Sequence, residues 1–150
     1  MSICMAVSND RYFADANYFV ALFNPTDASH AAALEVAEDV NNRDIHLVIS
    51  SFIFTEIVTV LSLRAGRKVG IEAGRCLLND NNIENIHIDK FLQEQSWEIF
   101  QATEHKNISF IDCSSVAIMQ TENISTALTF DTTDFKKLQK QYRFSLYPIV

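Results

Sequence analysis

The sequence is poor in residues that interrupt regular structure, with only three glycines and two prolines in 150 residues. We therefore expect few loops and mostly regular helices or strands. The three cysteines, Cys4, Cys76 and Cys113, are odd in number and lack the spacing of metal ligands. This pattern argues against a disulfide framework and is typical of a reducing cytoplasm, where thiols stay free.

Long hydrophobic runs are also absent. A membrane-spanning helix needs about 18 or more apolar residues, and the longest candidate, Phe52 to Leu63, is interrupted by Glu56. The opening segment MSICMAVSND lacks the basic region and apolar core of a signal peptide. We therefore expect no membrane span and a cytoplasmic location.

Positive charge is scarce, because 12 Lys and Arg residues face 19 Asp and Glu residues, giving a net charge of −7. This balance argues against a protein that coats DNA without regard to sequence. It does not exclude a nuclease, because bound metal ions change the local field. A hydrophobic content of 48% indicates a globular fold, and this length predicts one domain over residues 1–150.

Apolar segments along the chain alternate between strand and helix patterns. Strands are expected at 11–15, 46–50, 84–88, 126–130 and 144–150, and helices at 17–23, 30–42, 50–63, 67–79, 90–103, from Asp112, and 134–141. The expected helix caps are Asp27 or Ser29, Ser50 or Ser51, Asp89 and Thr133. Alternating elements imply right-handed crossovers and a parallel sheet covered on both faces, hence a three-layer α/β/α sandwich.

Four acidic residues occupy positions where a carboxylate is costly. Asp15 ends RYFAD, Glu56 interrupts SSFIFTEIVTVLSL, Asp112 closes SFID and Asp131 closes TALTFD. A charge near a core normally needs a partner or a metal ion. Ligands of parallel α/β sheets bind at the carboxyl ends of the strands, where Asp15 and Asp131 are predicted to lie. The four residues therefore predict one site for divalent cations.

Each acid also has a purely structural interpretation. Asp15 and Asp112 are good helix caps by composition, and Asp131 could be a turn residue. Glu56 is the hardest to explain in this way, because its helix face holds apolar neighbours, although a core glutamate paired with one arginine is an alternative. One shared site explains all four placements together.

The ordered set Asp, Glu, Asp, Asp resembles PIN domains, in particular the VapC-type toxin ribonucleases. The matching pieces are ADANYFVALF, SSFIFTEIVTVL, SFIDCSSVAIM and ALTFDTTDF, and the resemblance runs from about Tyr12 to Ile149. The family often has an acid followed closely by Asp-Phe, whereas DTTDF leaves two residues between Asp131 and Asp134. Asp134 therefore competes with Asp131 as the fourth acid, and Asp131 is favoured because it directly ends the apolar strand.

The resemblance implies an endoribonuclease that uses Mg²⁺ or Mn²⁺ to hydrolyse RNA phosphodiester bonds. It implies that Asp15, Asp112 and Asp131 ligate the ions and that Glu56 completes the cage or orients a water. Two ions about 4 Å apart would activate the attacking water and stabilise the leaving oxygen. The family further implies the toxin of a toxin–antitoxin pair, with an antitoxin protein as partner and a homodimer as the expected assembly.

Further residues have open roles at this stage. Asn17 could bind a carboxylate or phosphate or simply cap a helix, and Thr129 could bond a metal-bound water or simply suit a strand. The basic residues Arg64, Arg67, Lys68 and Arg75 could contact RNA phosphates or form a solvated helix face. Gly66, Gly70 and Gly74 recur every four residues, which could mark a partner groove or a frayed helix. Phe13 and Trp97 are predicted to be core residues rather than stacking platforms.

Two functions of other classes compete with the nuclease. One is a PIN-like scaffold that binds RNA or protein without nuclease activity. The other is a metal-dependent phosphatase or nucleotide hydrolase on a different α/β fold. The chain has no glycine-rich phosphate loop, which argues against an NTPase.

Overall fold

The computed structural model describes residues 10–148, so Cys4 and Ile149 lie outside the described range. Its elements, in chain order, are β1 Arg11–Ala14, α1 Ala16–Phe23, α2 His30–Asn42, β2 His46–Ser50, α3 Ser51–Ala65, α4 Arg67–Asn79, β3 Ile83–Ile86, α5 Lys90–Ala102, α6 Phe110–Thr121, β4 Thr126–Leu128, α7 Thr132–Tyr142 and β5 Ser145–Tyr147. The predicted alternation of strands and helices is confirmed.

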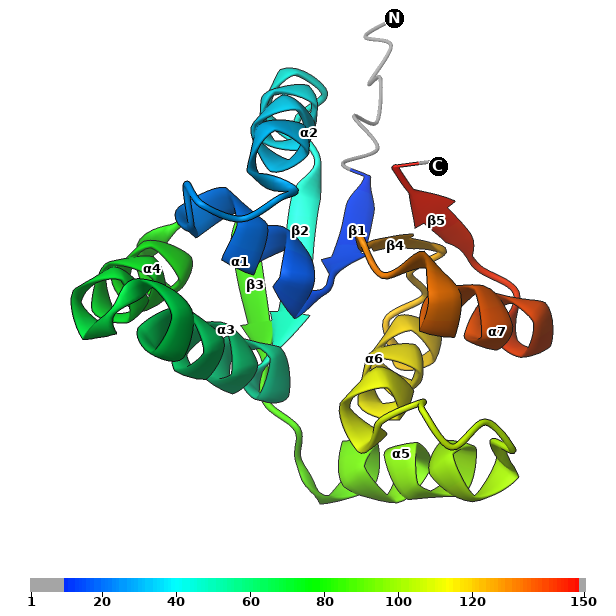
Figure 1. The fold of residues 1–150 in the computed structure, drawn as a ribbon. Helices are drawn as coiled ribbons and strands as arrows, with labels where there is room; N and C mark the ends of the chain where they lie inside the picture. Colours follow the sequence, from blue (N-terminus) through cyan, green and yellow to red (C-terminus); the bar gives the residue numbers. More distant parts are fainter. Residues whose placement is uncertain (1–9, 149–150) are drawn as a thin grey trace, which may run out of the picture.

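The five strands form one parallel sheet in the order β3-β2-β1-β4-β5. The chain moves from β1 outward to β3 and then returns across the sheet to β4 and β5. With right-handed crossovers, this reversal places α1–α4 on one face and α5–α7 on the other, as Figure 1 shows. The predicted three-layer α/β/α sandwich is confirmed.

The core lies between the sheet and the two helical layers. Strand residues such as Phe13 and Val48 are fully buried, and α3 contributes Ile53, Ile57 and Leu61, which recur every four residues on one helix face. The prediction for Phe13 is therefore correct. The prediction for Trp97 is wrong, because its side chain is 51% exposed on α5.

Several predicted boundaries hold and others need correction. Ser50 caps α3 and Asp89 caps α5, each by accepting a backbone N–H. The helix expected to start at Asp112 begins at Phe110, and the cap expected at Thr133 is Asp131. The last predicted strand positions, 129 and 130, lie beyond β4, which ends at Leu128; the Thr129 N–H still donates to the Tyr147 carbonyl of β5, and the chain bends at Phe130.

The three glycines belong to the junction and packing of α3 and α4. They mark neither a frayed helix nor a groove for a partner. Gly66 has a φ of +102° and joins the two helices, a conformation that L side chains rarely adopt. A Cβ atom at Gly70 would lie 2.2 Å from Ser62 Oγ and 3.0 Å from the Val58 carbonyl oxygen. The missing side chain therefore permits close contact within this chain.

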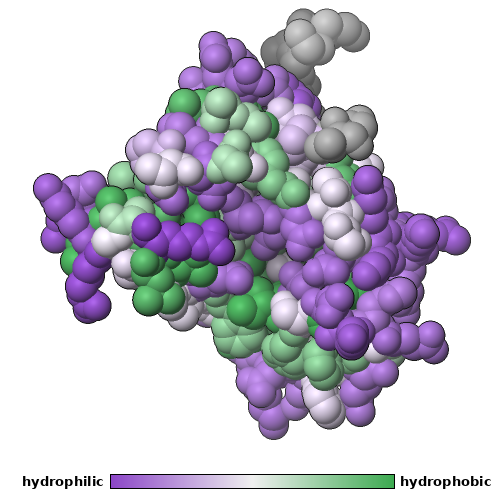
Figure 2. Space-filling model, in the orientation of Figure 1, coloured by the Kyte–Doolittle hydropathy of each residue, from purple (hydrophilic) through white to green (hydrophobic). Residues whose placement is uncertain are grey.

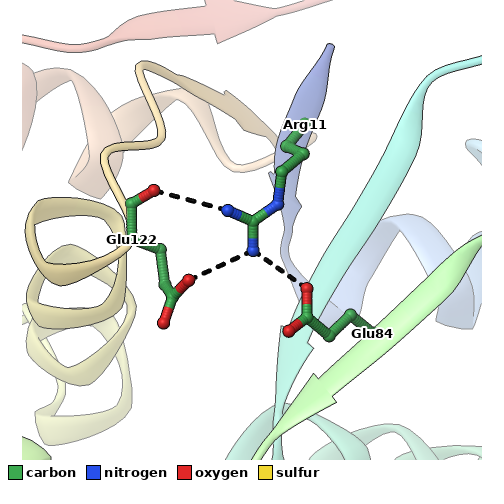
Figure 3. Close-up of polar contacts among 3 residues, drawn as sticks. All are labelled: Arg11, Glu84 and Glu122. Atoms are coloured by element: carbon green, nitrogen blue, oxygen red, sulfur yellow. Dashed lines mark hydrogen bonds and ion pairs between the residues drawn. The ribbon is translucent and has the colours of Figure 1, made fainter. Parts of the chain in front are cut away.

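At the amino-terminal edge of the sheet, Arg11 ties together elements that belong to different crossovers. Its Nη2 lies 2.9 Å from Glu84 Oε2 on β3 and 3.2 Å from Glu122 Oε2 at the end of α6, as Figure 3 shows. Both carboxylates raise the pKa of Arg11 against the opposing effect of burial. The cluster is partly exposed and lies at the edge opposite the carboxyl ends of the strands. None of the helices within residues 10–148 has the length and apolar character needed to cross a membrane.

Candidate functional site

The strand order reverses between β1 and β4, which are neighbours in the sheet but distant in sequence. In open α/β sheets such a reversal opens a crevice at the carboxyl ends of the strands. Asp15 directly follows β1, and its backbone N–H donates to the Leu128 carbonyl at the end of β4 with an N···O distance of 2.9 Å. Segments that carry two of the predicted acids therefore meet at this point.

Asp15 is the most buried of the four acids, at 8% exposed. Its Oδ1 accepts the Ala16 N–H at 2.9 Å and so caps α1, while Oδ2 accepts a bond from the Thr129 hydroxyl at 3.0 Å. Burial, followed by the negative charge of Asp112, raises the pKa of Asp15 to about 7, against the opposing effect of these two hydrogen bonds; Glu56 adds a smaller effect in the same direction. The helix cap is real, but it does not explain why two further carboxylates lie nearby.

Thr129 and Asn17 connect the segment after β4 to α1. The buried Thr129 oxygen donates to Asp15 and accepts bonds from the Asp131 N–H at 3.0 Å and from Asn17 Nδ2 at 3.2 Å. Asn17 Oδ1 accepts the Phe130 N–H at 3.1 Å. Both side chains therefore hold the two acid-bearing segments together. Asn17 is not the cap of α1, since Asp15 has that place.

Asp112 lies at the third position of α6 rather than at its start. It forms a capping box with Ser109: the Ser109 hydroxyl accepts the Asp112 N–H at 3.1 Å, and Asp112 Oδ2 accepts the Ser109 N–H at 2.9 Å. Burial raises the pKa of Asp112, the bonds to Ser109 oppose this effect, and Asp134 and Asp131 add to it. Ser109 was missed at the sequence level, although the spacing Ser-x-x-Asp in SFID is a signature of this motif.

Both candidates for the fourth acid lie near Asp112. Asp131 caps α7 through the N–H groups of Thr133 at 3.1 Å and Asp134 at 3.4 Å. Asp134 lies in the first turn of α7, with Oδ1 3.9 Å from Lys137 Nζ. Because both acids raise the pKa of Asp112, with Asp134 having the larger effect, the fold brings the two together instead of separating them.

Glu56 comes from the other side of the crevice, on α3. Its side chain is partly buried on the flank of the helix, whereas Ile53 and Ile57 are fully buried. The predicted inward position therefore needs correction to a position at the border of the buried face. Burial and then the charge of Asp112 raise its pKa. No ion pair to an arginine is present for Glu56 within the described part of the chain, which argues against the alternative of a core salt bridge.

The acids are therefore electrostatic neighbours but not a finished metal cage. Among residues 10–148, no group of three acidic, histidine or cysteine side chains is spaced to hold one metal ion. Asp15, Asp112 and Asp131 instead direct carboxylate oxygens toward backbone N–H groups at the N-termini of α1, α6 and α7. The donor chemistry nonetheless fits Mg²⁺ or Mn²⁺, since these ions prefer hard carboxylate oxygens and tolerate bound water in place of protein ligands.

The four basic residues predicted to contact RNA are not equivalent. Arg64, in the last turn of α3, lines a groove together with Glu56 and Asn17. Arg67, Lys68 and Arg75 are exposed on α4 and do not line that groove. Figure 2 shows hydrophobic surface over α3 and toward α5 and α6, whereas hydrophilic surface dominates over α7.

A parallel sheet covered on both faces, with a cluster of acids at its strand-order reversal, defines a class of α/β proteins whose site lies at the carboxyl edge of the strands. The family model described as PIN domain matches residues 12–141. The chain therefore belongs to the PIN domain family.

Two similar proteins are informative about the family. The 23S rRNA-specific endonuclease VapC20 of Mycobacterium tuberculosis is 28% identical over 119 residues, which span 79% of this chain and 88% of that protein. The crystal structure of the same VapC20, described as a Sarcin-Ricin loop cleaving toxin, superposes with a TM-score of 0.76 and 25% identity over 84% of this chain and 94% of that one. A VapBC2 structure from Rickettsia felis shares the fold with a TM-score of 0.63 and 20% identity, covering 91% of this chain and 96% of that one.

Proposed function

We propose that this protein is a metal-dependent endoribonuclease that hydrolyses RNA phosphodiester bonds. The observation that carries the proposal is the electrostatic effect of Asp112 on the carboxyl groups of Asp15 and Glu56, which come from other elements of the fold. Each has a pKa raised by burial, and Asp112 raises the pKa of both of the others. Neighbouring carboxylates that are partly buried without a cation are costly, and a cluster of acids with raised pKa values is typical of functional sites. The similarity to VapC20, an RNA endonuclease by its name, supports the same reaction class.

The residues that would hold the metal ions are Asp15, Glu56, Asp112 and Asp131, with Asp134 as a second candidate beside Asp131. Mg²⁺ or Mn²⁺, when bound, would supply an activated water and would neutralise the charge that develops on the phosphate. The contribution of the chain is positioning: Thr129 orients Asp15, Ser109 orients Asp112, and Asn17 ties α1 to the segment that precedes Asp131.

The partners proposed from the family resemblance are RNA as the substrate and an antitoxin protein that restrains the toxin, with the protein acting in the cytoplasm as a homodimer. VapC20 is itself described as a toxin, which supports this role. The half-exposed Trp97 and Phe100 on α5, with ring centroids 5.9 Å apart, provide apolar surface that a protein partner would cover.

A scaffold without nuclease activity is the second candidate, and one observation favours it: three of the acids already serve as helix caps or in a capping box. An Asp-to-Asn substitution separates the two functions, because asparagine caps helices about as well as aspartate but carries no charge. Asp15→Asn should therefore keep the fold and abolish cleavage. Asp89→Asn is the matched control, since Asp89 caps α5 and has no part in the acid cluster.

The experiment is cleavage of a mixed RNA pool, with and without Mn²⁺, by the unsubstituted protein and by the Asp15→Asn, Asp112→Asn and Asp89→Asn variants. If the protein is a nuclease, cleavage should depend on Mn²⁺. The cleavage rate should fall by at least about a hundredfold in Asp15→Asn and Asp112→Asn and stay unchanged in Asp89→Asn. Cleavage that survives Asp15→Asn and Asp112→Asn would assign the activity elsewhere. No cleavage by any of the proteins would favour the scaffold.

A further inference from the structure

A groove adjoins the acid cluster, and its lining includes both Glu56 of that cluster and the cationic side chain of Arg64. It has a volume of about 180 Å³ and lies between α1, α3, the loop before α2 and the segment after β4. Its lining residues are Ala16, Asn17, Val20, Asp27, Ser29, Glu56, Val60, Arg64 and Phe130. Because Glu56 belongs to both the groove and the acid cluster, an RNA strand bound at the cluster can continue into the groove.

Arg64 is the only cationic side chain among the residues that line this groove. It is exposed, and it has no ion pair with any of residues 10–148. Arg64 and Glu56 are eight residues apart on the same helix, which separates them by about 12 Å along its axis. A group held by Arg64 therefore lies beyond the atoms that react at the acid cluster.

The other polar side chains of the groove leave Arg64 as the anion-binding group. Asn17 is engaged at both amide atoms, by Thr129 and by the Phe130 N–H. Asp27 and Glu56 carry negative charge in the groove, and Asp27 Oδ1 accepts the Ser29 N–H at 2.8 Å. These two carboxylates repel an anion, so Arg64 is the side chain of this groove that attracts a phosphate.

We infer that Arg64 binds a backbone phosphate of the RNA that flanks the cleaved bond, so that this groove is a substrate subsite. The inference rests on the proposed ribonuclease function. A guanidinium binds phosphate in bidentate fashion, and an unpaired one loses no internal ion pair on binding. Arg67, Lys68 and Arg75 lie outside the groove and have no part in this subsite.

The structural alternative is that Arg64 serves only the end of α3, where a positive charge stabilises the helix dipole. That role would affect folding and leave RNA affinity unchanged. The salt dependence of RNA binding separates the two roles, because each phosphate contact to a single strand contributes about 0.7 to the slope of log affinity against log salt.

The test compares Arg64→Gln and Arg64→Lys with Arg75→Gln, a matched loss of charge outside the groove. Binding of a short, fluorescently labelled, mixed-sequence single-stranded RNA is measured by anisotropy across a salt series in Ca²⁺, with intactness checked on gels. Arg64→Gln should weaken binding about tenfold and lower the salt slope by about 0.7. Arg64→Lys should keep the slope and recover part of the affinity, and Arg75→Gln should match the unsubstituted protein.

Equal affinity and slope for Arg64→Gln and Arg75→Gln would overturn the subsite, as would a reduced stability of Arg64→Gln with unchanged RNA binding. A cleavage assay in Mn²⁺ keeps the two proposals apart. If the unsubstituted protein binds RNA through Arg64 but cuts none, the ribonuclease function fails and the binding groove stands. If it cuts RNA and Arg64→Gln binds and cuts equally well, only the subsite fails.

Discussion

At the scale of single residues, the acids combine a local and a tertiary role. Asp15 and Asp131 cap helices, and Asp112 completes a capping box. A helix N-terminus favours a negative charge. For Asp15 and Asp112, burial and neighbouring carboxylates outweigh this effect and raise the pKa. A helix cap alone would not produce such a cluster, and the excess of negative charge is the feature that a divalent cation would relieve.

Thr129→Val tests how the acid-bearing segments are held together. Valine keeps the shape of threonine but removes the hydroxyl that bonds Asp15, Asn17 and the Asp131 N–H. Leaving these buried groups without a partner should lower the free energy of unfolding by about 1–3 kcal/mol, as measured by urea denaturation. Thr129→Ser, which keeps the hydroxyl, should cost less. Equal losses for the two variants would assign the effect to packing of the methyl group.

At the scale of elements, the α3–α4 hairpin carries both Glu56 and Arg64, and the close packing of its two helices depends on Gly70 rather than on Gly74. At Gly70 an added Cβ would collide with Ser62 Oγ, which is itself bonded to the Val58 carbonyl at 2.7 Å. At Gly74 the nearest atom, Val58 Cγ2, lies 3.4 Å away, which is ordinary contact. The same substitution should therefore have opposite effects four residues apart.

Gly70→Ala should destabilise the protein by about 1–2 kcal/mol, because overpacking exceeds the gain in helix propensity. Gly74→Ala should be neutral or stabilising by up to about 1 kcal/mol, because it gains propensity without a clash. Urea denaturation of both variants measures these changes. A stabilising Gly70→Ala would show that the two helices can separate at little cost.

At the scale of the whole molecule, the acid cluster links stability to pH and to metal ions. The folded pKa of Asp15, about 7, exceeds its ordinary value of 3.8, so the folded state binds the proton more tightly. The resulting stability is fully present below about pH 4 and is lost as pH rises through about 7. Glu56 and Asp112 are shifted in the same direction. The pKa of Asp39 is lowered, so its contribution to stability changes only at acid pH, below about 4, and does not affect the comparison made above that pH.

The metal-free protein should therefore be less stable at pH 8 than at pH 5, by about 3 kcal/mol at most from Asp15, because the unfolded carboxyl is already ionised at pH 5. Millimolar Mn²⁺ or Mg²⁺ should restore stability at pH 8 and raise the melting temperature, because a ligand of the native state stabilises it. Thermal and urea unfolding in EDTA and in Mn²⁺ measure both effects, and one domain predicts a single transition. Asp15→Asn should flatten the pH dependence. A melting curve unaffected by Mn²⁺ would argue against the metal site.

Much of the fold could be predicted from local sequence pattern. The bounds of α2, β2 and α4 match the prediction to the residue, because apolar periodicity marks each segment, even though the glycines of α4 left a frayed helix open. The starts of α6 and α7 were misplaced, since several adjacent residues in SFID and DTTD can cap a helix and only the folded backbone decides between them. Apolar neighbours in the sequence predict a core position for Trp97, yet its side chain is 51% exposed beside Phe100, because the sequence does not show which face of α5 packs inward.

The sequence by itself determined the alternation of strands and helices and the parallel sheet, because these depend on periodicity. It also predicted a set of candidate acids, because placing charge among apolar residues is costly. Only the tertiary structure decided which side chains share a space. The reversal of strand order places Asp15 against the end of β4, and the path of α3 brings Arg64, but not the basic residues of α4, into the groove that adjoins the acid cluster. Contacts between residues more than a hundred positions apart depend on strand order and crossover direction, which no local pattern contains.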